Sequence, residues 1–187
     1  MVAALKLPYA FDPAALRADL RAVGADEWVP HFNQQYYEGG WSGVALRANG
    51  GASSRLLPDP ARRLTYDDTP LLDRCPYFRE VLRAFECPLE SVRLLRLGAG
   101  SRILEHRDFD LGFRYNTVRV HVPVLTNPEV EFYLDGERVS MAEGETWYLD
   151  LSLPHRVSNG GASDRIHLVI DCVVNEWVRG LLGNTER

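Results

Sequence analysis

Two residue types that commonly bind metals lie close together in the segment ILEHRDFD, residues 103–110. His106 and Asp108 are two positions apart, so at the end of a β-strand both side chains leave the same face. A third candidate ligand, His155, lies in the segment DLSLPHRVSNGG. Two histidines and one carboxylate occupy one face of an octahedral iron(II) ion and leave three positions open. The pattern predicts such a site, with Asp110 as a less favourable alternative to Asp108.

Cationic side chains follow on two apolar segments. Arg165 opens the segment RIHLVIDCVV, ten residues past His155, and its planar guanidinium suits bidentate binding of a carboxylate. Arg119 and His121 alternate with valines in TVRVHVPV. A buried arginine and histidine are costly without an anionic partner. A metal ion together with a dicarboxylic ligand would account for both the buried arginine and the buried histidine.

Each of these residues also has a plainer interpretation. An exposed turn at a strand end often contains a histidine and an aspartate, and His155 follows a proline, as a solvated loop residue could. Arg119 and His121, taken alone, fit the solvent face of a strand whose valines face the core. The joint pattern of ligands and arginines favours the metal site.

The elements that would position these residues are mostly short strands. A helix is expected over DPAALRADLRAVG, where Asp12 can cap it and Pro13 suits its first turn, and another over residues 76–85. Residues 50–69 are expected to form a long surface loop. We hypothesise that this loop acts as a lid over the site. From Ser91 onward, turn signals such as LDGE separate the following expected strands, before a last short helix over NEWVRGLL: SVRLLRL, SRILEH, TVRVHVPVL, VEFYL, ERVSM, TWYLDL and RIHLVIDCVV. This series predicts a mainly β fold with supporting helices, a double-stranded β-helix (jelly roll, cupin-like).

Composition limits the function classes. The 187 residues fit one domain, residues 1–187, with helical and strand support over 1–90 and a core jelly roll over 91–175. A formal charge of −5 argues against a nucleic-acid partner. Three cysteines without regular spacing suggest reduced thiols, and neither a signal-peptide pattern nor an apolar run of membrane-spanning length is found. We therefore expect a cytoplasmic protein without a membrane partner.

The chain resembles the iron(II)/2-oxoglutarate-dependent oxygenases of the aspartyl/asparaginyl β-hydroxylase family, which includes bacterial proline hydroxylases. The similarity runs from about Trp28 to Trp177 and is strongest in LGAGSRILEHRD, TVRVHVPV and GETWYLDLSLPHRVSNGGASDRIHLVIDCV. Animal-type members lack the carboxylate ligand, whereas this chain has Asp108, which places it towards the proline-hydroxylase-like branch.

The resemblance implies a role for each residue of the pattern. His106, Asp108 and His155 would hold Fe(II), and Arg165 would bind the distal carboxylate of 2-oxoglutarate. Arg119 and His121 would lie near the metal-chelating end of this cosubstrate, whereas no hydroxyl partner for Arg165 can be assigned. Candidate substrate contacts are Asn33, Trp41, Arg47 and Arg107, although Trp41 also suits a core position and Arg47 a strand surface.

The implied activity is a dioxygenase reaction in which decarboxylation of 2-oxoglutarate to succinate accompanies hydroxylation of an unactivated C–H bond. The expected partners are a small-molecule amino acid or peptide substrate and dioxygen. The alternative is a non-redox cupin-like metal-binding module, such as an isomerase or a ligand-binding regulator, which would not need Arg165. A plain β-sandwich interaction domain would instead place His106 and His155 far apart.

Overall fold

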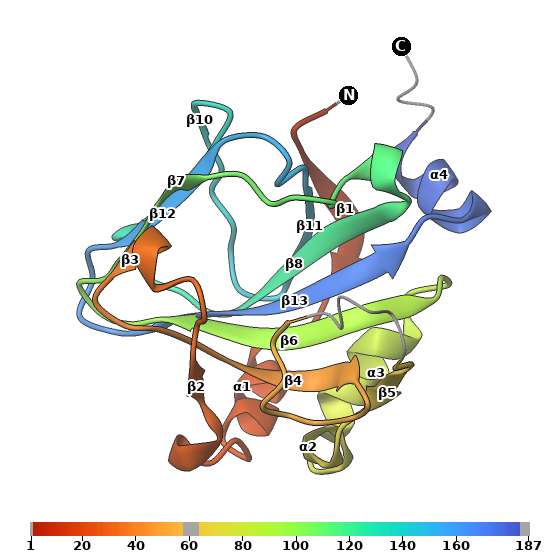
Figure 1. Ribbon diagram of the computed structural model, residues 1–187, viewed down its shortest axis with the longest axis horizontal. Coiled ribbons are helices and arrows are strands. Elements are labelled where there is room, and N and C mark those ends of the chain that lie inside the picture. The colour runs from red at the N-terminus through yellow and green to blue at the C-terminus, as the bar shows by residue number, and fades with distance from the viewer. Residues whose placement is uncertain (1, 58–63, 184–187) are drawn as a thin grey trace.

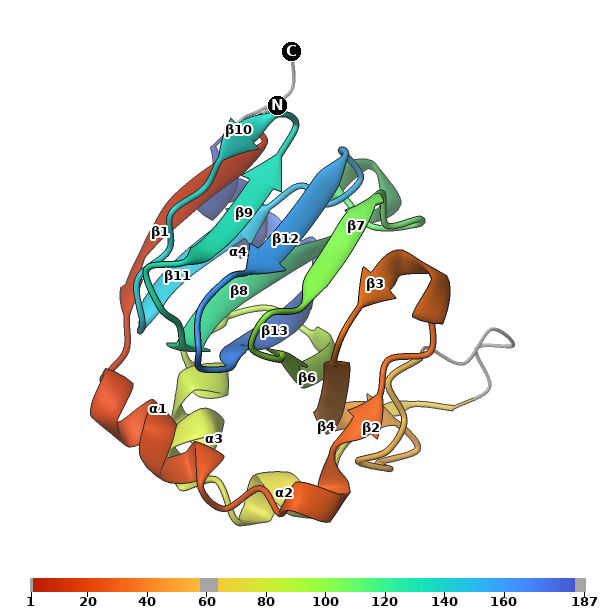
Figure 2. The same ribbon diagram turned by 90° about the vertical axis from the view of Figure 1, so that its left-hand side faces the viewer.

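The chain forms two antiparallel sheets that face each other, as the computed structural model shows for residues 2–57 and 64–183 (Figure 1). The first sheet has eight strands in the order β1-β11-β8-β13-β6-β4-β2, with β5 also paired to β4, and the second has five in the order β10-β9-β12-β7-β3. The strands are β1 (Ala4–Ala10), β2 (Val29–Pro30), β3 (Tyr37–Glu38), β4 (Trp41–Asn49), β5 (Tyr66–Asp68), β6 (Leu89–Leu97), β7 (Arg102–His106), β8 (Thr117–Leu125), β9 (Val130–Leu134), β10 (Glu137–Arg138), β11 (Glu145–Leu149), β12 (His155–Asn159) and β13 (Arg165–Val173). This arrangement confirms the predicted jelly roll (Figure 2).

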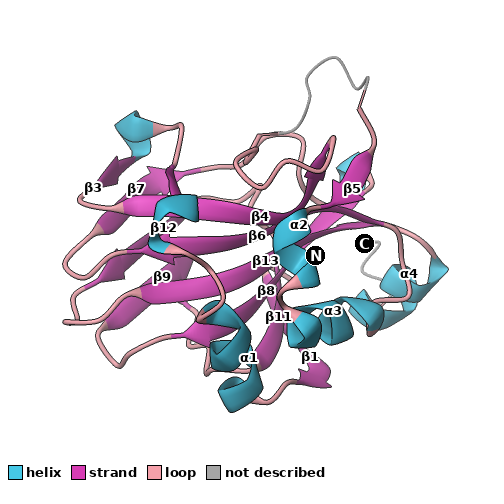
Figure 3. Ribbon diagram, turned by 90° about the horizontal axis from the view of Figure 1, so that it is seen from below, coloured by secondary structure: helices cyan, strands magenta, loops and turns pink. Residues whose placement is uncertain are grey.

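Four helices accompany the sheets: α1 (Pro13–Leu20), α2 (Pro70–Asp73), α3 (Pro76–Arg83) and α4 (Glu176–Leu182). Asp12 caps α1 by accepting a hydrogen bond from the backbone N–H of Ala14, as predicted. Helices α1 to α3 cover the outer face of the eight-stranded sheet (Figure 3). None of the helices in the described ranges is long and apolar enough to cross a membrane.

Strand β8 shows why the large sheet is buried on both faces. Val118, Val120 and Val122 belong to the apolar core shared with the helices. Arg119 and His121 alternate with them and line the space between the sheets. The interpretation in which these two polar residues face solvent is therefore wrong. A second apolar cluster packs the two sheets against each other. It contains residues from both sheets, among them Leu97 and Phe132.

Three segments differ from the sequence-based expectations. Residues 4–10 form the edge strand β1, in which Pro8 is tolerated because the register is irregular between Lys6 and Ala10. The expected surface loop over residues 50–69 contains β5, which pairs with β4, while its residues 58–63 lie outside the described ranges. No strand was expected over residues 155–159, which form β12, and His155 is its first residue.

Gly144 occupies a turn that only glycine fits, since its φ is +78° and an added Cβ would lie 2.1 Å from the carbonyl oxygen of Phe11. Gly136 also has a positive φ, +83°, but an added Cβ there meets no atom within 4 Å. We expect Gly144→Ala to lower the free energy of unfolding by more than about 3 kcal/mol and Gly136→Ala by about 1 kcal/mol. Urea unfolding of both variants checks this, and equal losses would contradict the assigned turn geometry.

Candidate metal centre and its cavity

The three predicted metal ligands meet at the end of the five-stranded sheet. Strands β7 and β12 are antiparallel neighbours, and His106 lies directly opposite His155 in their register. The two imidazole centroids are 4.2 Å apart. One ligand atom from each of His106, Asp108 and His155 lies within 4.8 Å of the other two. The structure therefore brings together residues that are almost fifty positions apart in the chain.

Both imidazoles are oriented by backbone carbonyl groups. Nδ1 of His106 lies 2.8 Å from the carbonyl oxygen of Leu104, and Nδ1 of His155 lies 3.0 Å from that of Leu153. Because a carbonyl oxygen only accepts hydrogen bonds, each Nδ1 carries the proton and each Nε2 keeps its lone pair. Such a contact fixes the tautomer of a histidine ligand. The two Nε2 atoms are thus available to a metal ion.

Asp108 follows the end of β7 and is held by its backbone and its side chain. Its N–H donates to the carbonyl oxygen of Leu151 at 2.9 Å. Its Oδ1 lies 3.7 Å from Nε2 of His106, while its Oδ2 accepts a hydrogen bond from Nη1 of Arg119 at 2.6 Å. Asp110 is exposed, has a φ of 55° and lies outside the ligand cluster. Two imidazoles and one carboxylate with open positions suit Fe(II).

The cluster lines a cavity of about 1180 Å³ between the sheets. Five side-chain atoms in the described ranges are buried without a hydrogen-bond partner: Trp41 Nε1, Arg93 Nε, His121 Nε2, Thr146 Oγ1 and Arg165 Nε. All but the threonine belong to residues that line this cavity. Buried polar groups of this kind normally have partners, so the cavity is built to receive a polar ligand.

Arg165 begins β13 and is only 3% exposed. Its Nη2 donates to Nδ1 of His167 at 2.9 Å. Nδ1 of His121 lies 3.2 Å from Nδ1 of His167. No carboxylate within salt-bridge distance of Arg165 occurs in the described part of the chain. Burial lowers the pKa of Arg165 to about 9, which reflects the cost of a buried cation without a counter-ion. A bound dianion would remove that cost.

Arg119 is tied to two aspartates. Asp171 lies opposite it on β13 and receives two hydrogen bonds, from Nε at 2.6 Å and from Nη2 at 2.9 Å. Nη2 of Arg93 donates to the same carboxylate at 3.0 Å. Burial would raise the pKa of Asp171, but Arg119 and Arg93 outweigh it and lower the pKa below its usual value. The sequence-based reasoning missed Arg93 and Asp171, although Asp171 continues the inward alternation of Arg165 and His167.

The predicted substrate contacts separate into two groups. Asn33, Trp41 and Arg107 line the cavity. Trp41 stacks on the ring of His31 with centroids 3.5 Å apart. Arg47 is absent from the cavity lining, because its guanidinium contacts Asp68 and two backbone carbonyl groups beside β4. It therefore lies at the surface position that the sequence offered as its alternative.

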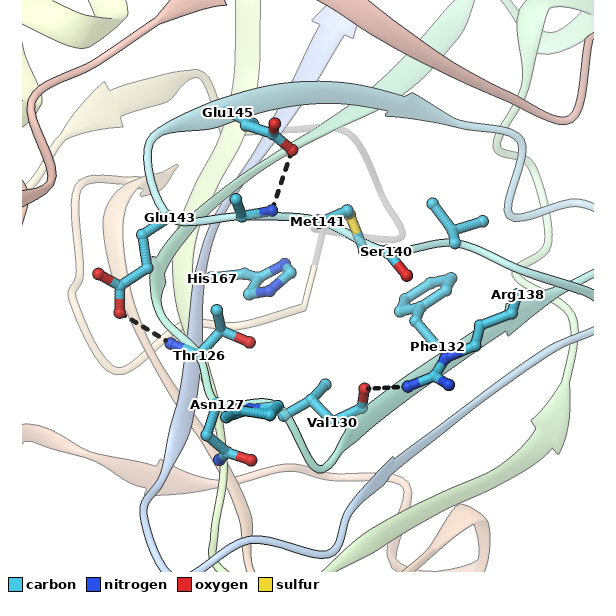
Figure 4. A pocket seen from close by; sticks show the side chains of 13 residues that line it. Thr126, Asn127, Val130, Phe132, Arg138, Ser140, Met141, Glu143, Glu145 and His167 are labelled. Atoms are coloured by element: carbon cyan, nitrogen blue, oxygen red, sulfur yellow. Dashed lines mark hydrogen bonds between the residues drawn. The ribbon is translucent and has the colours of Figure 1, made fainter.

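A second pocket of about 480 Å³ has His167 in its lining (Figure 4). Phe132 lines both this pocket and the large cavity. Glu143 and Glu145 at this pocket are already paired, with Arg17 and Lys6 respectively. The imidazole of His167 lines this pocket and accepts a hydrogen bond from Arg165, which lines the large cavity.

Four buried histidines in and beside the cavity predict a loss of stability in acid. Burial is the largest cause that lowers the pKa of His31 to about 3, and it also lowers the pKa values of His121 and His167 well below 6.5. These imidazoles stay neutral in the folded state but gain protons in the unfolded chain as the pH falls through 6.5. Their contribution is therefore present above that pH and lost below it. Burial likewise lowers the pKa of the fourth, His155, to about 4. Between about pH 7.5 and 5.5, the four imidazoles should together lower the free energy of unfolding by about 5 kcal/mol.

Urea unfolding of chelator-treated protein at these two pH values measures the loss. His31→Gln should reduce it by about one quarter, because one of the four titrating groups is gone. Equal stability of the parent protein at both pH values would contradict the neutral, buried state of these imidazoles.

Most of the chain matches one known family. The model of the family described as aspartyl/asparaginyl beta-hydroxylase matches residues 11–174. An L-proline cis-4-hydroxylase from Rhizobium meliloti (strain 1021) is 27% identical over 181 residues, which are 95% of this chain. The chain spans only 63% of the length of that relative.

Two solved structures share the fold at 16% sequence identity each. A Pseudomonas putida prolyl-4-hydroxylase aligns with a TM-score of 0.55 and covers 92% of this chain and 93% of its own. An oxidoreductase of the 2OG-Fe(II) oxygenase family from Burkholderia pseudomallei aligns with a TM-score of 0.53 and covers 91% and 85%. At this identity the similarity concerns the fold, whereas the family match extends over most of the sequence. The chain belongs to the aspartyl/asparaginyl beta-hydroxylase family.

Proposed function

We propose that this protein is an Fe(II)- and 2-oxoglutarate-dependent dioxygenase that hydroxylates an unactivated C–H bond of an amino acid or a peptidyl residue. The observation that carries the proposal is the cluster of His106, Asp108 and His155, with ligand atoms within 4.8 Å of one another. In the same cavity lies a buried Arg165 that has no carboxylate partner among the described residues. Membership in the family supports the same reaction.

The metal would bind to Nε2 of both histidines and to Oδ1 of Asp108. The two carbonyl contacts on Nδ1 keep the imidazoles in the required tautomer, and Arg119 occupies the other carboxylate oxygen. Three protein ligands on one face leave room for a cosubstrate and dioxygen. The bound iron, with 2-oxoglutarate and dioxygen, supplies oxidising chemistry that side chains lack.

The cosubstrate would extend from the metal to Arg165. The guanidinium has an unpartnered Nε and can bind a carboxylate through charge-assisted hydrogen bonds. The Nε2 atom of His121, also buried and unpartnered, lines the same cavity. Arg119 stays a predicted neighbour of the chelating end. The reaction converts 2-oxoglutarate to succinate and carbon dioxide, and one oxygen atom of dioxygen enters the substrate as a hydroxyl group.

The substrate would occupy the part of the cavity lined by Trp41 and Arg93. Trp41 Nε1 and Arg93 Nε are buried donors without partners, so both can bind the carboxylate or carbonyl oxygen of an amino acid. Asn33 and Arg107 also line this cavity and remain candidate contacts. The protein's part in the reaction is to hold the target carbon near the metal and to exclude water. The relative named above acts on L-proline by its name.

Two measurements on the purified protein test the proposed function. The first follows succinate formation from 2-oxoglutarate with Fe(II) and dioxygen. The second is a mass-spectrometric screen of free amino acids and short peptides for the gain of one oxygen atom, with proline as the first compound. Succinate and a hydroxylated product are expected. A protein that binds Fe(II) but forms no succinate with any of these compounds would instead be a non-redox metal-binding module.

A further inference from the structure

Asp171 has contacts with two buried arginines that the proposed mechanism does not use. Its buried carboxylate accepts hydrogen bonds from Nε and Nη2 of Arg119 and from Nη2 of Arg93. It is 7% exposed, and both arginines that bind it are largely buried. A chain of three charged side chains therefore runs from the middle of the large sheet to the metal ligand: Asp171, Arg119 and Asp108.

The backbone fixes the first link of this chain. Asp171 and Arg119 are directly opposed residues of β13 and β8, inside a register that is continuous from His167 to Val173. Two parallel N–H···O contacts to one carboxylate define the plane of the Arg119 guanidinium. Arg119 cannot rotate away without breaking both of them.

The second link determines which oxygen of Asp108 faces the metal site. A carboxylate at the end of a strand can bind a metal through one oxygen or through both. Nη1 of Arg119 donates to Oδ2 of Asp108 at 2.6 Å, whereas Oδ1 lies on the side of His106. With Oδ2 held by Arg119, Asp108 would bind a metal ion through Oδ1 alone.

We infer that Asp171 is a positioning residue, which orients Arg119 so that Asp108 presents a single oxygen to the metal. The inference rests on the proposed Fe(II) site. Asp171 has no place in the cluster of possible ligands, so it acts through Arg119 and not by binding the metal. Contacts of this kind around metal ligands typically change metal affinity by about 10- to 100-fold.

A double-mutant cycle measured by anaerobic equilibrium dialysis of Fe(II) tests this inference. Asp171→Asn should weaken Fe(II) binding by about 10- to 100-fold. Arg119→Gln should weaken it by at least as much, and the double variant should bind no more weakly than Arg119→Gln alone, because both changes break one chain. Asp19→Asn is the matched control, since Asp19 is also buried but accepts its hydrogen bond from the N–H of Phe78 in α3; it should keep the parental affinity.

The outcomes separate this inference from the proposed function. Parental Fe(II) affinity of Asp171→Asn, or additive losses in the double variant, overturns the positioning role and leaves the metal site intact. A parent protein that binds no Fe(II) overturns both. If Asp171→Asn alone does not fold, the Fe(II) affinity of the double variant, which lacks both charges, is compared with that of Arg119→Gln. Equal affinities then support the inference, and a tenfold weaker double variant overturns it.

Discussion

Asp108→Asn is expected to weaken Fe(II) binding by more than about 100-fold and to abolish succinate formation. The substitution removes the anionic ligand of the cluster while keeping nearly the same shape. It also leaves Nη1 of Arg119 facing an amide instead of a carboxylate, in a contact that measures 2.6 Å in the parent protein. Two neutral imidazoles alone do not compensate the charge of a divalent ion. Anaerobic equilibrium dialysis of Fe(II) gives the affinity directly.

Asp110→Asn is the matched control for this prediction. Asp110 is two positions further along, also lines the cavity and also carries a carboxylate, but it is exposed and outside the ligand cluster. Asparagine tolerates its positive φ of 55°. Fe(II) affinity should therefore stay within about twofold of the parent protein. If Asp110→Asn lost the metal and Asp108→Asn retained it, the assignment of the carboxylate ligand would be reversed.

Arg165→Met is expected to raise the dissociation constant of 2-oxoglutarate by about 100- to 1000-fold, because it removes a buried, charge-assisted contact. Fe(II) affinity without the cosubstrate should not change, since Arg165 contacts none of the three ligands and its hydrogen bond goes to His167. The folded state should tolerate methionine at this position, because a buried cation without a counter-ion is replaced by an apolar side chain. Anaerobic titration of 2-oxoglutarate into the Fe(II)-loaded protein measures the effect.

Two further variants make the Arg165 prediction specific. Arg165→Lys keeps the charge but loses the planar fork, so its loss of affinity should be smaller than that of Arg165→Met. Arg156→Met changes an exposed arginine whose guanidinium lies over the ring of Tyr133; it should bind 2-oxoglutarate as the parent does. Unchanged affinity in Arg165→Met would show that another group binds the distal carboxylate.

Local pattern was sufficient to predict the elements and residues that depend on neighbouring positions. The alternation of TVRVHVPVL predicted β8 with its bounds, and the capping signal at Asp12 predicted the start of α1. LDGE predicted the hairpin turn between β9 and β10, where Asp135 and Gly136 both have positive φ. His106 and Asp108 could be chosen as candidate metal ligands because they are two positions apart at a strand end. Their distance from His155 depends on the pairing of β7 with β12, which the sequence left open.

Contacts that depend on the order of strands in the sheet could not be predicted from the sequence. Asp171 meets Arg119 and Arg93 because β13 lies between β8 and β6. Nothing within the segment RIHLVIDCVV specifies these neighbours. The edge strand β1 was missed for a related reason, since Pro8 and a mixed composition hide a strand that depends on β11 as its partner. The division of the chain at about residue 90 and a cytoplasmic location stay predictions.

We propose that the ligand cluster and Arg165 together bind Fe(II) and 2-oxoglutarate in one cavity. Anaerobic titration of the protein with Fe(II), with and without 2-oxoglutarate, tests it through the weak visible charge-transfer band of the iron–cosubstrate chelate. The band should appear only when both are present. It should be absent in Asp108→Asn and should require a much higher cosubstrate concentration in Arg165→Met. A parent protein that shows no band at saturating Fe(II) and 2-oxoglutarate would contradict this binding site.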